Sequence, residues 1–342
     1  MKVECKMRKV IKKLLFLTYL PIITIILLEI GVRIYGSSEH YIYDPVYMPF
    51  NGNADIPFIH KPNLKNVRGR GLSIFNTDSL GLRFKISGAQ YGPKNINEYR
   101  IAITGDSVTF GEGIRKTEDT FPQVLEDLLN KKQNNINVKV FNYGVSAYSV
   151  KHMAATLSSR MLEIEPDLVL MAIIPDDFDL SHRSAVVDKY GFTMYPKITR
   201  FWSKDSNLKR YLRKIRLVYL LSDIRCRYQT KPNKHNILQE KLPESYEFIK
   251  QFKDISDKQN LSYSIVLLPM IDDKFGGLIL EQFQKDKIAY IDLTSLSNEF
   301  SLNQFIASKF DGHPSVMVHK RIGETLAEYI FKEYLCNYKK WN

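Results

Sequence analysis

From Arg100 onward, short apolar runs alternate with stretches in which apolar residues recur at helical spacing. The apolar runs predict five buried strands, at residues 101–104, 138–141, 168–174, 261–268 and 288–291. The helical stretches include residues 121–129, 149–162 and 315–334. Short apolar strands that alternate with helices are typical of a parallel sheet with helices on both faces. The pattern therefore predicts an α/β fold with three layers, α/β/α.

The amino terminus has a different pattern, a basic cluster followed by a long apolar run. Residues 1–13 carry six Lys or Arg and one acid, and residues 14–32 are almost entirely apolar. A helix over residues 14–32 would rise about 28 Å, close to the thickness of a hydrocarbon core. Basic residues before the span orient the amino terminus inside. We therefore expect residues 1–13 to be a cytoplasmic tail and residues 14–32 to be a single uncleaved anchor in the cytoplasmic membrane.

A cleaved signal peptide is the alternative for this segment. Its apolar region would be unusually long, and the only cleavage candidate after it is Gly36-Ser37-Ser38. On either interpretation, the rest of the chain lies outside the cytoplasm.

Two further segments depart from the alternating pattern. Residues 33–98 are rich in Pro and Gly, which predicts an irregular segment that wraps an edge of the domain. Residues 183–240 interrupt the main domain at 99–336 and hold fourteen Lys or Arg against four acids, most of the net charge of +12. We interpret them as a basic helical insertion over the carboxyl edge of the sheet. It is either a solvated or lipid-facing surface, or a guide for an anionic glycan or lipid-linked substrate.

Two compact motifs supply the residue types of nucleophilic catalysis. Ser107 follows the first predicted strand through a Gly-Asp turn, so its hydroxyl is expected at the carboxyl edge of the sheet, where open α/β sheets build their sites. Asp311 and His313 precede the last predicted helix. A serine needs a base to become a nucleophile near neutral pH, and a carboxylate orients that base. The sequence therefore predicts a site formed by Ser107, His313 and Asp311.

These motifs resemble those of the SGNH (GDSL) hydrolase superfamily, in particular its membrane-anchored members. The resemblance covers roughly residues 100–330, and a weaker likeness extends to the tract at residues 76–83. It implies a flavodoxin-like three-layer fold with Ser107 as nucleophile, His313 as base and Asp311 as the acid that orients the base. It also implies an oxyanion hole formed by the N–H groups of Ser107 and Gly144.

One position departs from the family pattern. Members carry an Asn after the third strand whose amide donates to the oxyanion, and Asp176 stands at that position. An ionised carboxylate accepts hydrogen bonds and would repel an oxyanion unless burial protonated it. The sequence therefore leaves the third oxyanion donor in doubt.

Other chemistries find less support in the sequence. No metal ligands at recognisable spacing and no cofactor motif are present, and clustered acids at residues 176–179 are more typical of a solvated or capping loop. Cys226 and Cys336 are either a disulfide or two lone thiols, while Cys5 is expected inside the cell. Nucleic-acid binding fits the charge but not the expected compartment. The oligomeric state is not indicated.

The resemblance and the expected topology together predict an extracytoplasmic serine esterase or O-acetyltransferase. Its substrates would be ester-linked acyl groups, O-acetyl groups above all, on cell-envelope or exported polysaccharide. Hydrolysis and transfer to a sugar hydroxyl share one acyl-enzyme, so both stay open. A lipid esterase or lysophospholipase is an alternative. An inactive SGNH domain that binds glycan in an envelope assembly complex is another, favoured by Asp176.

Overall fold

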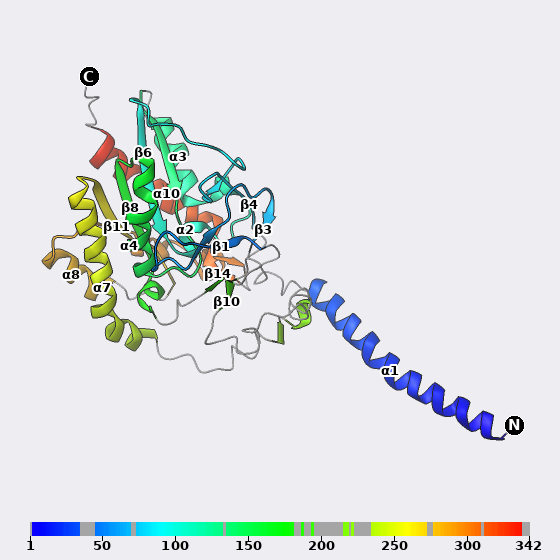
Figure 1. Cartoon of the computed structure of the whole chain (residues 1–342). Helices are drawn as coiled ribbons and strands as arrows, with labels where there is room; N and C mark the ends of the chain where they lie inside the picture. The colour runs from blue at the N-terminus through cyan, green and yellow to red at the C-terminus, as the bar shows by residue number, and fades with distance from the viewer. Residues whose placement is uncertain are drawn as a thin grey trace.

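A computed structural model describes most of the chain. It covers residues 2–34, 45–69, 73–132, 135–180, 186–187, 193–194, 215–218, 220–221, 234–271, 276–308 and 311–336. Figure 1 shows one α/β domain with a long helix, α1 (Lys2–Ile34), that extends away from it.

A five-stranded parallel sheet forms the centre of the domain. Its strands are β6 (Glu98–Gly105), β7 (Asn137–Asn142), β8 (Leu168–Ile173), β11 (Ser262–Leu267) and β12 (Tyr290–Asp292). Their order is β12-β11-β8-β6-β7. The first strand in sequence, β6, thus has the second, β7, on one side and the remaining three, β8, β11 and β12, on the other. This is the flavodoxin-like order. The five predicted strands and the predicted fold class are confirmed, with strand ends shifted by a few residues.

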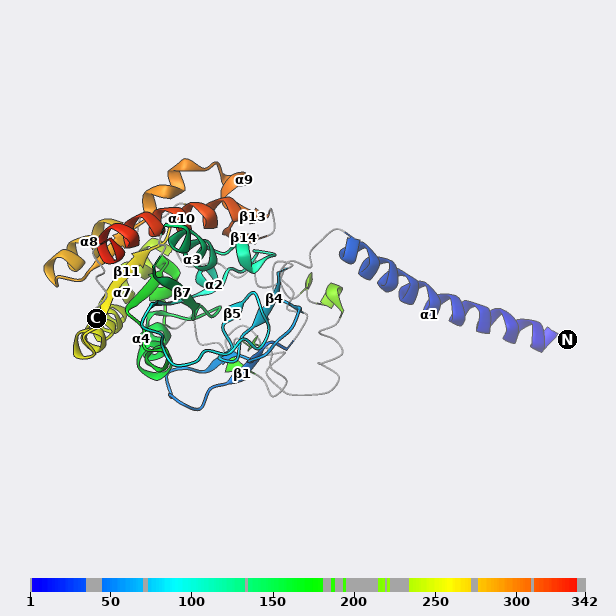
Figure 2. The same cartoon turned by 90° about the horizontal axis from the view of Figure 1, so that it is seen from above.

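Helices cover both faces of this sheet, because the strands are apolar on both sides. Ile101 and Ile103 of β6 pack in one buried cluster with α3 (Phe121–Lys132) and α10 (Val316–Ile330). Ala102 packs in the opposite cluster with α4 (Val150–Ser159), α7 (Lys234–Lys258) and α8 (Gly276–Lys285). Figure 2 shows α3 and α10 on one side of the strands and α4 and α7 on the other. Fully buried parallel strands of this kind read as continuous apolar runs, which explains why the sequence pattern located them.

Short elements connect the main ones. The helical ones are α2 (Ser107–Phe110), α9 (Leu302–Phe305), the 3₁₀ turns η3 (Thr117–Asp119), η4 (Met161–Ile164), η5 (Pro175–Phe178) and η6 (Thr294–Glu299), and the π-helical turn η7 (Phe331–Leu335). Strands β13 (Ile306–Ser308) and β14 (Asp311–Pro314) pair antiparallel, as do β9 (Val186–Val187) and β10 (Thr193–Met194). The predicted last helix at 315–334 thus consists of α10 and η7.

The segment before the main domain forms two small antiparallel sheets on its edge. One pairs β1 (Tyr47–Pro49) with β2 (Phe58–His60), and the other joins β3 (Val67–Arg68), β4 (Ile74–Thr77) and β5 (Arg83–Phe84). Between β4 and β5, the buried Asp78 carboxylate accepts hydrogen bonds from the N–H groups of Leu80 and Leu82 and from the Tyr91 hydroxyl. Burial raises the pKa of Asp78 against these hydrogen bonds, which lower it. The tract at residues 76–83 therefore builds a tight turn.

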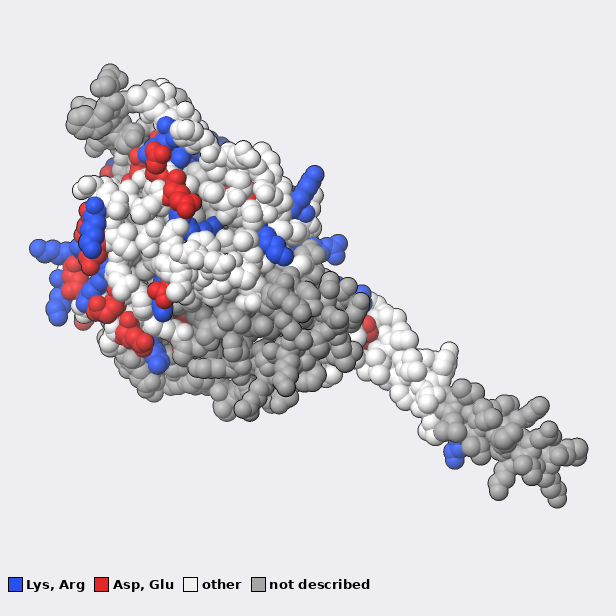
Figure 3. Space-filling model, in the orientation of Figure 1, with Lys and Arg blue, Asp and Glu red and all other residues white. Residues whose placement is uncertain are grey.

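The amino-terminal helix contains one stretch that is long and apolar enough to cross a membrane. Phe16–Ile34 has a mean hydropathy of 1.9 and is not buried against the domain. Figure 3 shows this part of α1 as mostly uncharged, whereas acidic and basic side chains intermingle on the domain surface. Near its end, Arg33 Nε donates to Glu29 Oε1 at 2.8 Å, the pairing that the four-residue spacing indicates. Length and composition fit a membrane anchor and a signal sequence alike.

Most of the predicted basic insertion at residues 183–240 lies outside the described residues, as does Cys226. In the described part of the insertion, the N–H groups of Arg216 and Leu217 donate to the Glu29 carboxylate at 3.0 and 2.8 Å. Helix α7 begins at Lys234, inside the range predicted for the insertion, and packs on the central sheet. Cys336 has a free thiol.

Candidate active site

The turn after β6 places Ser107 at the carboxyl edge of the sheet. A Cβ at Gly105 would lie 2.0 Å from Thr109 Oγ1 and 2.8 Å from the Ala172 carbonyl oxygen, so only glycine fits there. Asp106 caps the short helix α2, with Oδ1 accepting from the Val108 N–H at 2.9 Å. Ser107 is therefore the first residue of α2, and it is 8% exposed.

Strand β14 brings Asp311 and His313 to this serine. His313 Nε2 lies 2.9 Å from Ser107 Oγ, and His313 Nδ1 lies 2.5 Å from Asp311 Oδ1. Asp311 also accepts from the His313 backbone N–H at 3.2 Å, which fixes its carboxylate beside the ring. The structure thus brings together the three residues that the sequence predicts. The imidazole bridges a hydroxyl and a buried carboxylate, the arrangement that transfers a proton from the hydroxyl and stabilises the resulting imidazolium.

Gly144 lies close to α2. A Cβ there would be 2.4 Å from the Phe110 nitrogen and 2.7 Å from the Thr109 carbonyl carbon, so close approach of two backbones requires glycine. Its N–H, however, donates to Asn142 Oδ1 at 2.9 Å. In this structure the Gly144 N–H is therefore engaged by a side chain and not turned to an open oxyanion position. The same Asn142 side chain donates to the Thr109 carbonyl at 2.9 Å.

Asp176 lies on η5, which follows the strand next to β6 in the sheet, and its side chain is exposed. The burial that the sequence leaves open for Asp176 is therefore not found in the structure. Its neighbour Asp177 is the buried one, and its Oδ2 accepts from the Ile174 N–H at 2.8 Å. This hydrogen bond gives Asp177 the role of closing the turn after β8.

A second carboxylate faces His313, and the sequence motifs do not indicate it. Glu112 Oε2 lies 3.5 Å from His313 Nε2, and the Glu112 side chain is 4% exposed. Glu112 Oε1 accepts a short hydrogen bond from Ser146 Oγ. The one signal in the sequence is the pair of glycines around it, Gly111 and Gly113, which have φ values of 87° and 79° and so permit the loop to turn toward the site.

Arg83, which belongs to the amino-terminal segment, holds this loop by hydrogen bonds. Its buried guanidinium donates to the carbonyl oxygens of Phe110, Gly111 and Ile114. Burial lowers the pKa of Arg83 to about 9, against the opposite effect of nearby acids. The tract at residues 76–83, which the resemblance associates with anchored SGNH members, thereby contacts the segment that carries Ser107 and Glu112.

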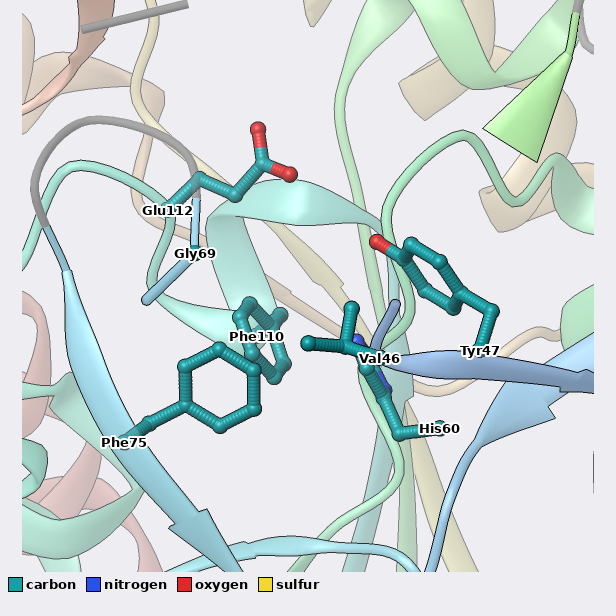
Figure 4. A pocket seen from close by; sticks show the side chains of 7 residues that line it. All are labelled: Val46, Tyr47, His60, Gly69, Phe75, Phe110 and Glu112. Carbon is teal, nitrogen blue, oxygen red and sulfur yellow. The ribbon is translucent and has the colours of Figure 1, made fainter. Parts of the chain in front are cut away.

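A small cavity of about 10 Å³ lies beside α2. Figure 4 shows the side chains that line it, which come from the amino-terminal segment and from the segment after β6: Val46, Tyr47, His60, Gly69, Phe75, Phe110 and Glu112. The His60 ring stacks on Phe110 with centroids 4.4 Å apart. Burial lowers the pKa of His60 to about 3, so this ring is neutral at physiological pH. The cavity is room for about one water molecule.

Two further histidines, His319 and His152, have structural contacts. His319 is fully buried in α10 and accepts from the Phe121 N–H at 3.1 Å, so it is a packing residue. His152 Nδ1 accepts from the Ser149 N–H at 2.8 Å at the start of α4. Within the described ranges, no group of three or more His, Cys, Asp or Glu side chains is arranged to hold a metal ion.

No protein-family model and no curated protein sequence matches the chain. Among solved structures, the chain is similar to a G-D-S-L family protein from Desulfitobacterium hafniense DCB-2, with 15% identity, a TM-score of 0.41, and 67% of this chain and 98% of that chain covered. It is similar to a psychrotrophic esterase from Pseudoalteromonas sp. with 13% identity, a TM-score of 0.42, and 70% and 99% covered. It is also similar to a catalytic mutant of an acetylxylan esterase from Geobacillus stearothermophilus, with 15% identity, a TM-score of 0.38, and 72% and 96% covered. At these sequence identities and TM-scores, the chemistry of the chain has to be argued from its own residues.

Proposed function

We propose that the protein is a serine esterase or acyltransferase that acts on ester-linked acyl groups through Ser107, His313 and Asp311. The observation that carries this proposal is the pair of short contacts on one imidazole, 2.9 Å to Ser107 Oγ and 2.5 Å to Asp311 Oδ1. A merely structural histidine would have no need of a hydroxyl at the carboxyl edge of the sheet on one side and a buried carboxylate on the other.

The mechanism follows from this geometry. Ser107 Oγ attacks the acyl carbonyl carbon while its proton passes to His313 Nε2. Asp311 keeps the proton of the neutral ring on Nδ1 before this transfer and stabilises the imidazolium after it. Collapse of the tetrahedral intermediate returns that proton to the leaving alcohol and leaves an acyl-enzyme. A water molecule or an acceptor hydroxyl, deprotonated by His313, then takes the acyl group and regenerates Ser107.

Stabilisation of the oxyanion is proposed to come from backbone N–H groups. The Ser107 N–H belongs to the first turn of α2, where a helix has no acceptor of its own. The Gly144 N–H would be a second donor once the Asn142 side chain releases it. Loss of one oxyanion donor costs about 3 kcal/mol of transition-state stabilisation. An enzyme that lacks the family's amide at position 176 would therefore depend on these two groups.

The proposed substrates are O-acetyl groups of cell-envelope or exported polysaccharide. Two features support this class. The apolar stretch Phe16–Ile34 would hold the domain at a membrane surface, with the domain on the extracytoplasmic side. In Figures 1 and 2, β14 lies in the half of the domain from which α1 projects, which favours a substrate presented near the membrane.

The first test is labelling of the full-length protein in detergent with a fluorophosphonate probe, followed by acetate release from O-acetylated glycans. We expect Ser107→Ala to abolish labelling and to lower acetate release by at least about a thousand-fold. Ser158→Ala, which removes an exposed hydroxyl on α4, is the matched control and should leave both unchanged.

The same experiment separates the alternatives. A lysophospholipid that is turned over faster than any acetylated glycan would indicate a lipid esterase. Acetate transfer to an added oligosaccharide, with little release to water, would indicate an acetyltransferase. Absence of labelling in a folded wild-type protein that still binds glycan would indicate an inactive binding domain and would refute the enzymatic proposal.

A further inference from the structure

We propose that Glu112 is a positioning residue of the candidate active site, whose carboxylate stabilises the imidazolium of His313 from the Nε2 side. This inference rests on the proposed function, because an imidazolium forms only if His313 takes the Ser107 proton. Asp311 occupies the Nδ1 side of the ring at 2.5 Å, so Glu112, 3.5 Å from Nε2, is a second and separate negative group.

The contact favours the charged state over the resting one. In the neutral ring with its proton on Nδ1, Nε2 carries a lone pair 2.9 Å from Ser107 Oγ, and a carboxylate 3.5 Å away gains nothing from that lone pair. The Ser107 hydroxyl also lies within reach of Asp106 Oδ2, at 3.2 Å. After proton transfer, Nε2 carries a hydrogen and the ring carries a positive charge, so the same carboxylate becomes attractive. Interactions that strengthen toward the transition state accelerate a reaction, whereas uniform binding does not.

The protein holds Glu112 in place from several directions. The Glu112 N–H donates to the Ser107 carbonyl oxygen at 2.9 Å, which couples its backbone directly to the nucleophile. Ser146 Oγ donates to its Oε1, which leaves Oε2 to face the ring. Gly113, the next residue, allows no side chain, because a Cβ there would lie 2.8 Å from Ala307 Cβ and 3.1 Å from Asp311 Oδ2.

Burial supports a functional reason for this carboxylate. A charged side chain taken out of water is costly unless it is paired and hydrogen-bonded. The Glu112 side chain is 4% exposed and faces the same imidazole as a second buried carboxylate, Asp311, whose side chain is 3% exposed. Two negative groups around one imidazole repel each other in the resting protein, and the imidazolium between them relieves that repulsion.

The test uses Glu112→Gln in the full chain in detergent. Glutamine keeps the length of the side chain and the acceptor for Ser146 but removes the negative charge. We expect the second-order rate of fluorophosphonate labelling and the kcat of a short acyl ester to fall by about ten-fold or more, with KM unchanged. Glu118→Gln removes an exposed acid from the same segment and should change neither. The thermal unfolding midpoint of each variant shows whether the effect is structural.

The outcomes are distinct. Glu112→Gln with wild-type rates would refute the role of Glu112 while leaving the proposed function intact, and so would a loss confined to KM or matched by a large fall in the unfolding midpoint. A wild-type protein that takes no label at all would refute both. If Glu112→Gln does not fold, Ser146→Ala replaces it, because it frees the carboxylate without removing the charge. We then expect labelling to slow by about three-fold or more, and an unchanged rate would contradict the proposal.

Discussion

At the scale of single residues, the loop after β7 holds backbone strain close to the candidate site. Ala147 has a φ of 68°, a left-handed conformation that costs a residue with a Cβ on the order of 1 kcal/mol. Its neighbours explain why it persists. The Ser146 hydroxyl donates to Glu112, and the buried Tyr148 hydroxyl donates to the Phe58 carbonyl at 2.5 Å. The backbone between two such anchored side chains has little freedom to relax.

We expect Ala147→Gly to raise the free energy of unfolding by about 1 kcal/mol, because glycine adopts positive φ without strain. Chemical denaturation of the full chain in detergent would measure it. Asn260→Gly is a suitable control, since Asn260 also has a positive φ, 53°, but asparagine tolerates that region better than alanine. Destabilisation by Ala147→Gly would mean that the φ of Ala147 does not store strain.

Sequence reasoning reached some of the site residues and missed others for physical reasons. Ser107 follows a Gly-Asp turn at the end of a strand, and Asp311 and His313 directly precede the last helix. These positions could therefore be predicted from the sequence. Glu112 could not, because its contact with His313 depends on how a loop between two left-handed glycines turns in space. The hydrogen bond from the Gly144 N–H to Asn142 could not be predicted either, because a sequence does not show which nearby acceptor a backbone N–H will use. The exposure of Asp176 depends on the 3₁₀ turn, in which Asp177 is the acid that turns inward.

At the scale of secondary-structure elements, the packing of α10 on α3 depends on one small residue. A Cβ at Gly323 would lie 2.7 Å from Val124 Cγ1 and 3.1 Å from the Phe121 carbonyl oxygen. The two helices therefore approach each other more closely at this point than any other residue would permit. Because β14 leads directly into α10, this packing also fixes the strand that carries Asp311 and His313.

We expect Gly323→Ala to lower the free energy of unfolding by about 1–2 kcal/mol, since overpacking outweighs the gain in helix propensity. Gly277→Ala offers a matched control in α8, where no atom lies within 4 Å of the added Cβ. That variant should be neutral or stabilising by up to about 1 kcal/mol. Equal effects of the two substitutions, compared by urea unfolding, would argue against the close contact.

Elements differed in how well their sequences revealed them. The five central strands are buried on both faces and so appear as apolar runs, which made them predictable. The strands of the amino-terminal segment are two to four residues long and are held by distant partners. Arg83, for example, donates to carbonyl groups about thirty residues further along the chain. No local pattern encodes such contacts, so that segment could be predicted only as irregular.

At the scale of the whole molecule, two buried histidines make stability depend on pH. Burial lowers the pKa of His60 and of His319 from 6.5 to about 3. In the unfolded chain both would bind protons below about pH 6.5. The folded state, which keeps them neutral, therefore has its full stability above that pH and loses it as the pH falls toward 3.

We expect acidification from pH 7.5 to 5 to lower the free energy of unfolding by about 2 kcal/mol for each of these histidines. His60→Phe keeps an aromatic ring against Phe110 and removes a buried Nε2 that has no hydrogen-bond partner among the residues that the structure describes. This variant should lose about 2 kcal/mol less of its free energy of unfolding on acidification than the wild type. Unfolding curves of both proteins at the two pH values would decide, and identical losses would show that His60 does not contribute.

The separation of 206 positions between Ser107 and His313 also has a consequence for biosynthesis. Ser107 emerges early, but Asp311 and His313 belong to β14, which is among the last elements to be made. Strand β14 is fixed only when α10 packs on α3. A nascent or truncated chain therefore has a serine without a partner. Contacts of such long sequence separation form late in folding, because their loop-closure entropy must be overcome first. The candidate active site is thus completed only in a finished domain, after an anchored chain would have crossed the membrane.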